Sequence, residues 1–244
     1  SGGGAGGSVG GSTAEETGGS PPVPDFFVRR VVQENGREKI VIDYARYVEF
    51  LNENGFRKFR KEKDILLVRV QDNIVTEVEI ADIQSFIKGY ITRNGLDRRF
   101  LNEIISKDAL WNKLKTQFLD DLPNKFLEHT KDAGWFLFGN CALKVPKDGD
   151  PEAYEYGELP LPVWKKKIRE RELDLELLQD DGKSEMEAFC ERVTMGNPKR
   201  KEALMLTIGY LLHSYKDPAV SKAVIFQDEE IPMIRGIANG GTGK

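Results

Sequence analysis

The sequence has few of the residues that cross-link secreted proteins or hold metal ions. Its 244 residues include only two cysteines and two histidines. Cys141 and Cys190 lie far apart without the spacing of a zinc site, so we expect buried free thiols in a reducing compartment rather than a disulfide. His129 has no candidate ligand beside it in the sequence, and we expect no metal ion there.

Long apolar runs and an excess of positive charge are also missing. No stretch approaches the length of a membrane span and no signal peptide is visible, so we predict a cytoplasmic chain without a membrane partner. The formal net charge of −4 excludes a global basic field, and any contact with nucleic acid must therefore come from local patches. The 244 residues are enough for one large domain or two small ones, and the hydrophobic content of 39% supplies adequate core material.

Composition divides the chain into four parts, and the fold class that they indicate is α+β. Residues 1–25 are rich in Gly, Ser and Pro and bury too little surface to offset the entropy of ordering, so we predict a disordered linker. Residues 26–178 predict a small mixed α/β accessory domain. Residues 179–218 predict a helical, collar-like segment, and residues 219–244 hold a strand followed by a glycine-rich loop.

Helix and strand patterns alternate along the accessory domain. Short apolar runs flank Asn35-Gly36 and predict a hairpin over residues 26–42. Asp43 is a helix cap, and Gly55 ends the helix that it begins. The other predicted elements are strands at 65–70 and 74–78, a helix over 80–94, helical structure over 97–128, and a hairpin over 135–145.

The collar-like segment has apolar residues at helical spacing on both sides of Gly196. From Ser184 one helix runs to Gly196-Asn197-Pro198, and a second follows it. Pro218 restricts the residue before it, so the second helix closes by about Tyr215. His213 lies at its end, where we expect a C-terminal cap rather than a catalytic group.

Two local patches carry positive charge and are the candidates for contact with a nucleic-acid backbone. In residues 56–63, basic residues alternate with Phe56 and Phe59, which could stack on bases. The competing interpretation is an edge strand whose cations prevent aggregation while both Phe residues face the core. The second patch spans residues 164–172, where periodicity does not decide between strand and helix. The candidate contacts are Arg57, Lys58, Arg60, Lys61, Lys165, Lys166 and Lys167.

The closing residues fit a phosphate-binding loop. From Ala238 the sequence has Ala in the first Gly position, four free residues and Gly243-Lys244, and a Ser or Thr would complete the pattern. Glycine takes positive φ and has no Cβ, so successive N–H groups can turn toward phosphate oxygens, while Lys244 adds charge near the β- and γ-phosphates. The apolar run 223–226 predicts the preceding strand. The predicted nucleotide-binding residues are Asn239, Gly240, Gly241, Thr242, Gly243 and Lys244; the competing interpretation is a glycine-rich surface turn.

Several of these segments together resemble a known family. The helix Ile208–Pro218, the strand Lys222–Ile225 and the loop Asn239–Lys244 look like those of phage and large-DNA-virus primase-helicases, the poxvirus-type superfamily 3 helicases. The segment Phe138–Leu143 is similar to the hairpin that precedes the ATPase of this family. The specific resemblance covers about 35 residues, and weaker similarity extends back to roughly Phe26.

The resemblance implies an ATP-driven, hexameric DNA translocase that acts in viral replication, with Mg²⁺ as the metal partner of ATP. The expected partners are then DNA, as a single strand or a fork, and other copies of the chain, in the cytoplasm of a phage-infected bacterium. The acidic Walker B residues, the sensor Asn and the arginine finger of such an ATPase would follow residue 244. We therefore expect this chain to be a fragment that itself neither hydrolyses ATP nor unwinds DNA.

Two other functions fit parts of the same pattern. A non-enzymatic nucleic-acid-binding module would use the two basic patches and would bind DNA in a salt-dependent way that Lys244→Ala leaves unchanged. A small-molecule kinase with a phosphate-binding loop would usually carry that loop near its N-terminus, whereas here more than 230 residues precede it. Asp228, Glu229 and Glu230 precede the loop, whereas Walker B acids follow it, so we assign them no role.

Overall fold

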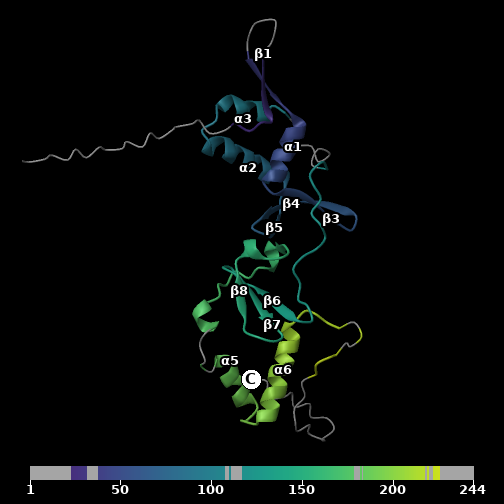
Figure 1. The fold of residues 1–244 in the computed structure, drawn as a ribbon, viewed down its shortest axis with the longest axis vertical. Helices are drawn as coiled ribbons and strands as arrows, with labels where there is room; N and C mark the ends of the chain where they lie inside the picture. Colours follow the sequence, from purple (N-terminus) through teal and green to yellow (C-terminus); the bar gives the residue numbers. More distant parts are fainter. Residues whose placement is uncertain are drawn as a thin grey trace, which may run out of the picture. The chain divides into compact units, whose positions relative to one another are not determined.

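The computed structural model describes residues 23–31, 38–107, 110, 117–178, 182, 184–217, 219 and 222–225, and all structural statements below refer to these residues. The chain forms two compact units (Figure 1). Unit 1 comprises Ser1–Val70 and Glu77–Asn124, and unit 2 comprises Gln71–Thr76 and Lys125–Lys244. The predicted accessory domain over 26–178 therefore contributes residues to both units.

Unit 1 begins with the hairpin and the capped helix that the sequence predicts. Strands β1 (Phe27–Val31) and β2 (Glu38–Ile42) pair antiparallel, and the Asn35-Gly36 turn lies outside the described residues. Helix α1 (Tyr44–Glu53) starts where Asp43 Oδ1 accepts hydrogen bonds from two backbone N–H groups of its first turn. It ends at Gly55, which has a φ of +84° and lies so close to Val70 that a Cβ would be 2.1 Å from the Val70 carbonyl oxygen.

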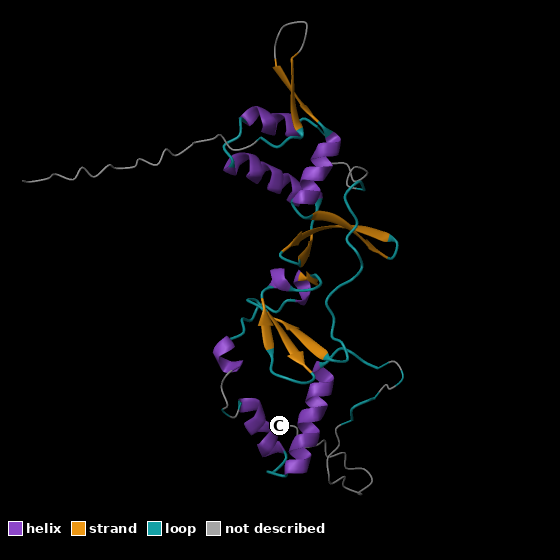
Figure 2. Ribbon diagram, viewed as in Figure 1, coloured by secondary structure: helices purple, strands orange, loops and turns teal. Residues whose placement is uncertain are grey.

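The rest of unit 1 is a β-hairpin and two helices (Figure 2). Strands β3 (Phe56–Lys61) and β4 (Asp64–Gln71) pair antiparallel. Helix α2 (Ile80–Arg93) begins with a capping box between Glu79 and Asp82, and α3 (Arg98–Ile105) follows it. The core of unit 1 is rich in aromatic rings, and its buried phenylalanines are Phe26, Phe27, Phe50, Phe56 and Phe100.

Unit 2 contains an antiparallel sheet and a short parallel pair. The sheet consists of β6 (Ala133–Leu137), β7 (Ala142–Pro146) and β8 (Glu152–Tyr154), so the predicted second hairpin is confirmed. Strand β5 (Ile74–Glu77) pairs in parallel with β9 (Val163–Trp164). Three 3₁₀ helices complete this region: η2 (Tyr156–Glu158), η3 (Lys165–Lys167) and η4 (Leu175–Leu178).

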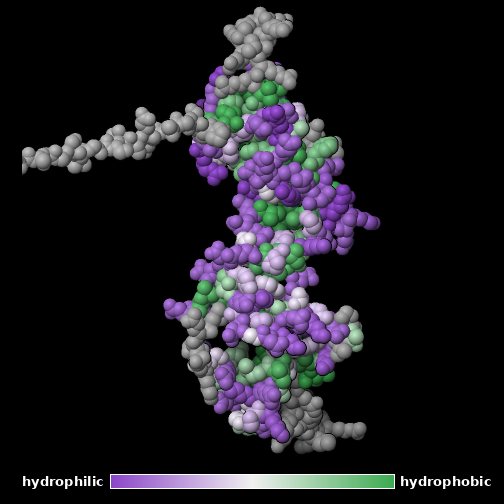
Figure 3. All heavy atoms as spheres, in the orientation of Figure 1, coloured by the Kyte–Doolittle hydropathy of each residue, from purple (hydrophilic) through white to green (hydrophobic). Residues whose placement is uncertain are grey.

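Two helices, α5 (Glu185–Val193) and α6 (Pro198–Leu212), occupy the predicted collar-like segment. Ser184 caps the first, and Asn197 caps the second with Pro198 in its first turn. Cys190 is the only buried residue of α5, and none of the 15 residues of α6 is buried. Both helices therefore leave apolar side chains exposed (Figure 3): Met186, Phe189, Val193, Met205, Leu206, Leu211 and Leu212.

The helical prediction over residues 97–128 is confirmed for Arg98–Ile105, whereas residues 117–128 form no helix. Residues 108–109 and 111–116 of this prediction lie outside the described residues. Instead, Lys58 of β3 and Asp121 form an isolated parallel bridge. Lys58 donates its backbone N–H to the carbonyl of Asp120 at 3.0 Å and accepts from the N–H of Leu122 at 2.7 Å. The edge of β3 thus provides partners for backbone groups that a helix would have paired internally.

The predicted strand before the phosphate-binding loop is also absent from the described part of the chain. Residues 222–225 have no strand structure, and Ile225 is 84% exposed. A strand needs a neighbour to complete its hydrogen bonds, and no described segment pairs with this one. Phe226 lies outside the described residues. Among the helices that the structure describes, none has both the length and the apolar character needed to cross a membrane.

Candidate nucleic-acid interface

The predicted nucleotide-binding loop lies outside the residues that the structure describes. It comprises Asn239, Gly240, Gly241, Thr242, Gly243 and Lys244. The structure therefore bears only on the other candidate residues, which belong to the two basic patches.

The two aromatic residues of the first patch are buried. Phe56 and Phe59 of β3 are 1% and 5% exposed. The Phe56 ring packs edge-on against Phe86 at 5.2 Å, and the guanidinium of Arg69 lies 4.9 Å from its centroid. The suggestion that these rings stack on bases is wrong for this structure, because the rings already lie inside the protein. The competing interpretation, with both Phe residues facing inward, is the one observed.

The cations nearest these rings are bound within unit 1. Arg57 Nη1 donates to the backbone carbonyls of Asn52 at 2.5 Å and Phe56 at 2.8 Å. Lys58 Nζ donates to the carbonyl of Gln117 at 2.7 Å and lies 3.6 Å from a carboxylate oxygen of Asp121, with its side chain only 15% exposed. Both side chains therefore stabilise the edge of β3 rather than extend into solvent.

The outer end of the first patch is more open. Arg60 is exposed and has a 3.9 Å contact with Asp121, and Lys61 is exposed at the end of β3. Figure 3 shows a hydrophilic surface over this end of the β3–β4 hairpin. Asp121 is shared between Lys58 and Arg60, so it offsets part of the local positive charge.

The second patch has the opposite arrangement. Lys165, Lys166 and Lys167 form the single turn η3, and all three are exposed. The preceding Trp164 is buried, and Lys166 Nζ lies 4.9 Å from the centroid of its ring. The backbone N–H of Arg169 donates to the carbonyl of Leu137 at 3.1 Å and so ties the end of the turn to β6. The backbone thus anchors a turn whose three lysine residues are exposed.

In unit 2, Lys167 and Arg169 of the second patch line a cavity of about 660 Å³, which we call the basic groove. The other residues of its lining were not selected from the sequence. Its polar and aromatic lining includes Glu128, His129, Trp135, Phe136, Lys167, Arg169, Ser214, Tyr215 and Lys216. The two histidines of the chain meet here: the ring centroids of His129 and His213 are 4.9 Å apart, although 84 residues separate them. No local motif in the sequence signals this meeting.

The structure explains the orientation and the charge state of His129. Its Nδ1 accepts the backbone N–H of Ser214 at 3.4 Å, and its ring lies edge-on to Phe136 at 5.3 Å. Burial lowers the pKa of His129, and electrostatic repulsion by His213 and Lys167 lowers this pKa further. A hydrogen bond to the backbone of Trp135 opposes the shift. His129 is therefore uncharged at neutral pH in the free protein.

Lys216 is held at the end of α6. Its Nζ donates to the carbonyls of Tyr210 at 2.7 Å and His213 at 2.8 Å, and it lies 3.7 Å from the centroid of the Tyr210 ring. These carbonyls belong to the end of the helix, where the dipole favours a cation. His213 itself occupies the C-cap position, as the sequence predicts.

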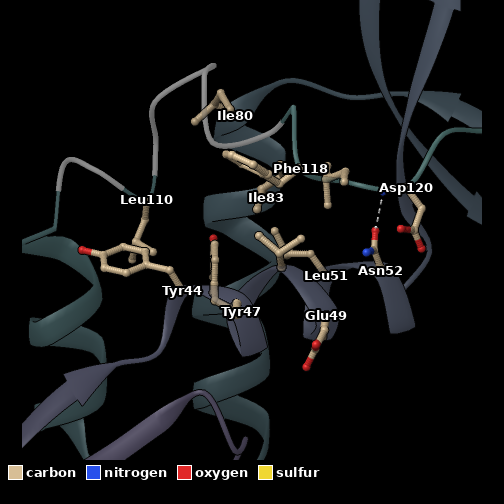
Figure 4. A pocket seen from close by; sticks show the side chains of 13 residues that line it. Tyr44, Tyr47, Glu49, Leu51, Asn52, Ile80, Ile83, Leu110, Phe118 and Asp120 are labelled. Atoms are coloured by element: carbon tan, nitrogen blue, oxygen red, sulfur yellow. Dashed lines mark hydrogen bonds between the residues drawn. The ribbon is translucent and has the colours of Figure 1, made fainter.

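Unit 1 contains a second cavity of a different character, with a volume of about 410 Å³ (Figure 4). Its lining is mainly apolar and includes Leu51, Ile83 and Phe118. Tyr47 is 4% exposed, its hydroxyl has no hydrogen-bond partner among the described residues, and burial raises its pKa. The cavity offers neither an acid–base pair nor a cluster of cations, so we assign it no chemistry.

Among the described residues there is no group of three or more His, Cys, Asp or Glu side chains that could hold a metal ion. Comparison with family models, with curated proteins and with solved structures finds no match to this chain. The basic groove and the turn Lys165–Lys167, which we call the lysine turn, are the candidate interface.

Proposed function

We propose that this chain is the DNA-binding accessory region of a phage or viral replicative helicase that couples ATP hydrolysis to unwinding. The observation that carries the DNA-binding part is the turn Lys165–Lys167, whose three ammonium-bearing side chains are exposed on an anchored backbone. The partner is DNA, as a single strand or a fork.

The physical basis of this binding is the release of counterions from the phosphate backbone. A chain with a net charge of −4 has no global attraction for DNA, so the attraction is local. Lys165, Lys166, Lys167 and Arg169 together can neutralise about four phosphates, which gives a slope of about −3 for log K against log salt on a single strand. Binding is thus modest and salt-dependent, as befits a region that holds DNA for a motor.

The ATPase part of the proposal rests on the loop Asn239–Lys244 and on the resemblance it carries. Its backbone N–H groups would cradle the phosphates of ATP, and Lys244 would offset charge near the β- and γ-phosphates. Mg²⁺ would bridge oxygens of the β- and γ-phosphates of the bound ATP.

The exposed apolar side chains of α5 and α6 support a homo-oligomer, which for this kind of motor would be a hexamer. Phe189 is 50% exposed, Leu206 68% and Leu211 56%. Apolar side chains grouped in this way favour burial against another surface. Sedimentation of the 244-residue chain should therefore show an assembly that the double substitution Leu206→Lys and Leu211→Lys dissociates. A monomer in both cases would contradict this part of the proposal.

The central experiment measures binding of a fluorescein-labelled oligo(dT) strand by anisotropy at several salt concentrations. The 244-residue chain should bind in a salt-dependent way, and changing Lys165, Lys166 and Lys167 together to Ala should remove most of the affinity. The control changes Arg60 and Lys61 of unit 1 to Ala, which should have little effect on the affinity for oligo(dT). Absence of binding by the unaltered chain would refute the DNA-binding proposal.

A second experiment separates the motor from a binding module without enzymatic activity. With Mg²⁺ present, Lys244→Ala should abolish ATP binding and leave DNA binding by the lysine turn intact. If the unaltered protein retains no nucleotide while DNA binding persists, the non-enzymatic module is the correct function.

A further inference from the structure

The basic groove has a positive lining that the rest of unit 2 does not neutralise. Lys167 and Arg169 come from η3 and the residues just after it, and Lys216 comes from the segment that follows α6. Within the described part of the chain, no carboxylate forms an ion pair with any of these three side chains. Glu128 is the one acidic residue of the lining. The groove therefore favours an anionic ligand.

Aromatic rings line the same groove. Phe136 of β6 is half-buried, and Tyr215 beyond α6 is 37% exposed. The His129 ring lies between Phe136 and His213, with centroid distances of 5.3 Å and 4.9 Å. Cations beside partly exposed rings are the combination that holds a phosphate together with a planar base.

Gly134 makes room for this group of rings. A Cβ at this position would lie 3.2 Å from Phe136 Cε2 and 3.3 Å from His213 Cδ2. Its distance to His129 Nδ1 would be 3.6 Å. A side chain here would push against the rings from the strand that supports them, so the shape of the groove depends on this glycine.

We propose that the basic groove binds one nucleotide unit of single-stranded nucleic acid. Its phosphate lies against Lys167 and Arg169, and its base stacks on Phe136 or Tyr215. This inference rests on the proposed DNA binding and specifies where and how the strand is held. The volume of about 660 Å³ lies in the range of small-molecule sites and admits a nucleotide but not a duplex, whose bases are also stacked and unavailable.

The first test separates the groove from the general charge of the segment. Two double variants remove the same charge from unit 2: Lys167→Ala with Arg169→Ala inside the groove, and Lys147→Ala with Arg171→Ala outside its lining. Anisotropy of labelled oligo(dT) with the 244-residue chain should show about a tenfold loss for the first pair and less than about threefold for the second. Equal losses would overturn the groove while leaving the proposed DNA binding in place.

The second test concerns the base. Phe136→Leu keeps an apolar side chain in β6 but removes the aromatic ring, and Tyr215→Ala removes a ring that is already partly exposed. Each should weaken binding of oligo(dT), and neither should affect binding of an abasic strand of the same length, because that strand has phosphates but nothing to stack. Circular dichroism checks that both variants fold. If neither variant affects oligo(dT), the stacking part of the proposal is wrong.

A third test identifies the source of the nucleotide. Free thymidine monophosphate and ATP are added as competitors against labelled oligo(dT), together with unlabelled strand and duplex. The single strand should compete best, with the duplex and the free nucleotides far weaker. Competition by a free nucleotide as strong as that by the strand would reassign the groove to a mononucleotide ligand. If the unaltered chain binds no strand at all, the proposed function fails first and this inference fails with it.

Discussion

The two basic patches have similar composition but different surroundings. In β3, Arg57 and Lys58 donate to backbone carbonyls, and Asp121 lies within reach of Lys58 and Arg60. In η3, three successive lysines are exposed, and Lys166 Nζ lies 4.9 Å from the centroid of the Trp164 ring. The comparison shows that the number of cations in a segment does not decide its role. What decides it is whether the charged groups are held by carbonyl and carboxylate oxygens of the protein, as those of Arg57 and Lys58 are, or belong to exposed side chains such as Lys165 and Lys167.

The largest effect is expected for Phe56→Ala, which tests whether the aromatic residues of β3 belong to the core or contact DNA. Its ring is 1% exposed within the core of unit 1, so Phe56→Ala should lower the free energy of unfolding by about 3–5 kcal/mol. Chemical denaturation followed by circular dichroism measures the loss. The fraction that remains folded should bind DNA as before. A DNA-specific defect with normal stability would mean that the ring contacts bases after all.

The next effect concerns the lysine turn. Changing Lys165, Lys166 and Lys167 to Glu replaces attraction by repulsion, so the affinity for single-stranded DNA should fall about a hundredfold at moderate salt. The matched reversal at Arg60 and Lys61 should cost less than about threefold, because Asp121 already offsets charge there. Anisotropy titrations compare the two variants, and similar losses would remove the distinction between the patches.

A smaller effect is expected at Lys58. Lys58→Met keeps much of the aliphatic stem but removes the hydrogen bond to the Gln117 carbonyl, which should cost about 1 kcal/mol of stability. Affinity for DNA should not change. Thermal unfolding and anisotropy together test this, and a loss of affinity without a loss of stability would place Lys58 at the interface.

The smallest effect is a pH dependence at His129. Its pKa is lowered in the folded protein, so the folded state binds fewer protons than the unfolded chain and loses stability as the pH falls below about 6.5. A phosphate in the basic groove reverses part of this shift, so DNA affinity should rise about threefold between pH 7 and pH 5.5.

His213, Lys167 and Glu128 surround His129 and also affect this response, so the control is His129→Gln. In titrations at matched ionic strength, the DNA affinity of this variant should rise less between pH 7 and pH 5.5 than that of the unaltered chain. A rise that is unchanged by His129→Gln would assign the effect to another group.

The sequence predicts the local elements well where a cap or a turn determines them. The Asp43 cap and the Gly55 end of α1 are examples, because each signal acts within a few residues. Residues 117–128 have apolar spacing typical of a helix, but their backbone instead pairs with Lys58 of β3, about 60 residues earlier. The basic groove depends on His129 and His213 in the same way, and no local pattern encodes such a distant meeting.

The way in which the chain passes between its two units limits how they can be separated. It passes from unit 1 to unit 2 at Val70–Gln71, returns at Thr76–Glu77 and passes again at Asn124–Lys125. Cutting one peptide bond therefore cannot divide the chain into unit 1 and unit 2. A fragment that stops at residue 124 would keep Val75, which is 0% exposed, but would lack the parallel partner β9 and so uncover an unpaired strand edge. A fragment that starts at Lys125 would in turn lack Gln71–Thr76, so unit 2 is complete only together with this segment from the first half of the chain.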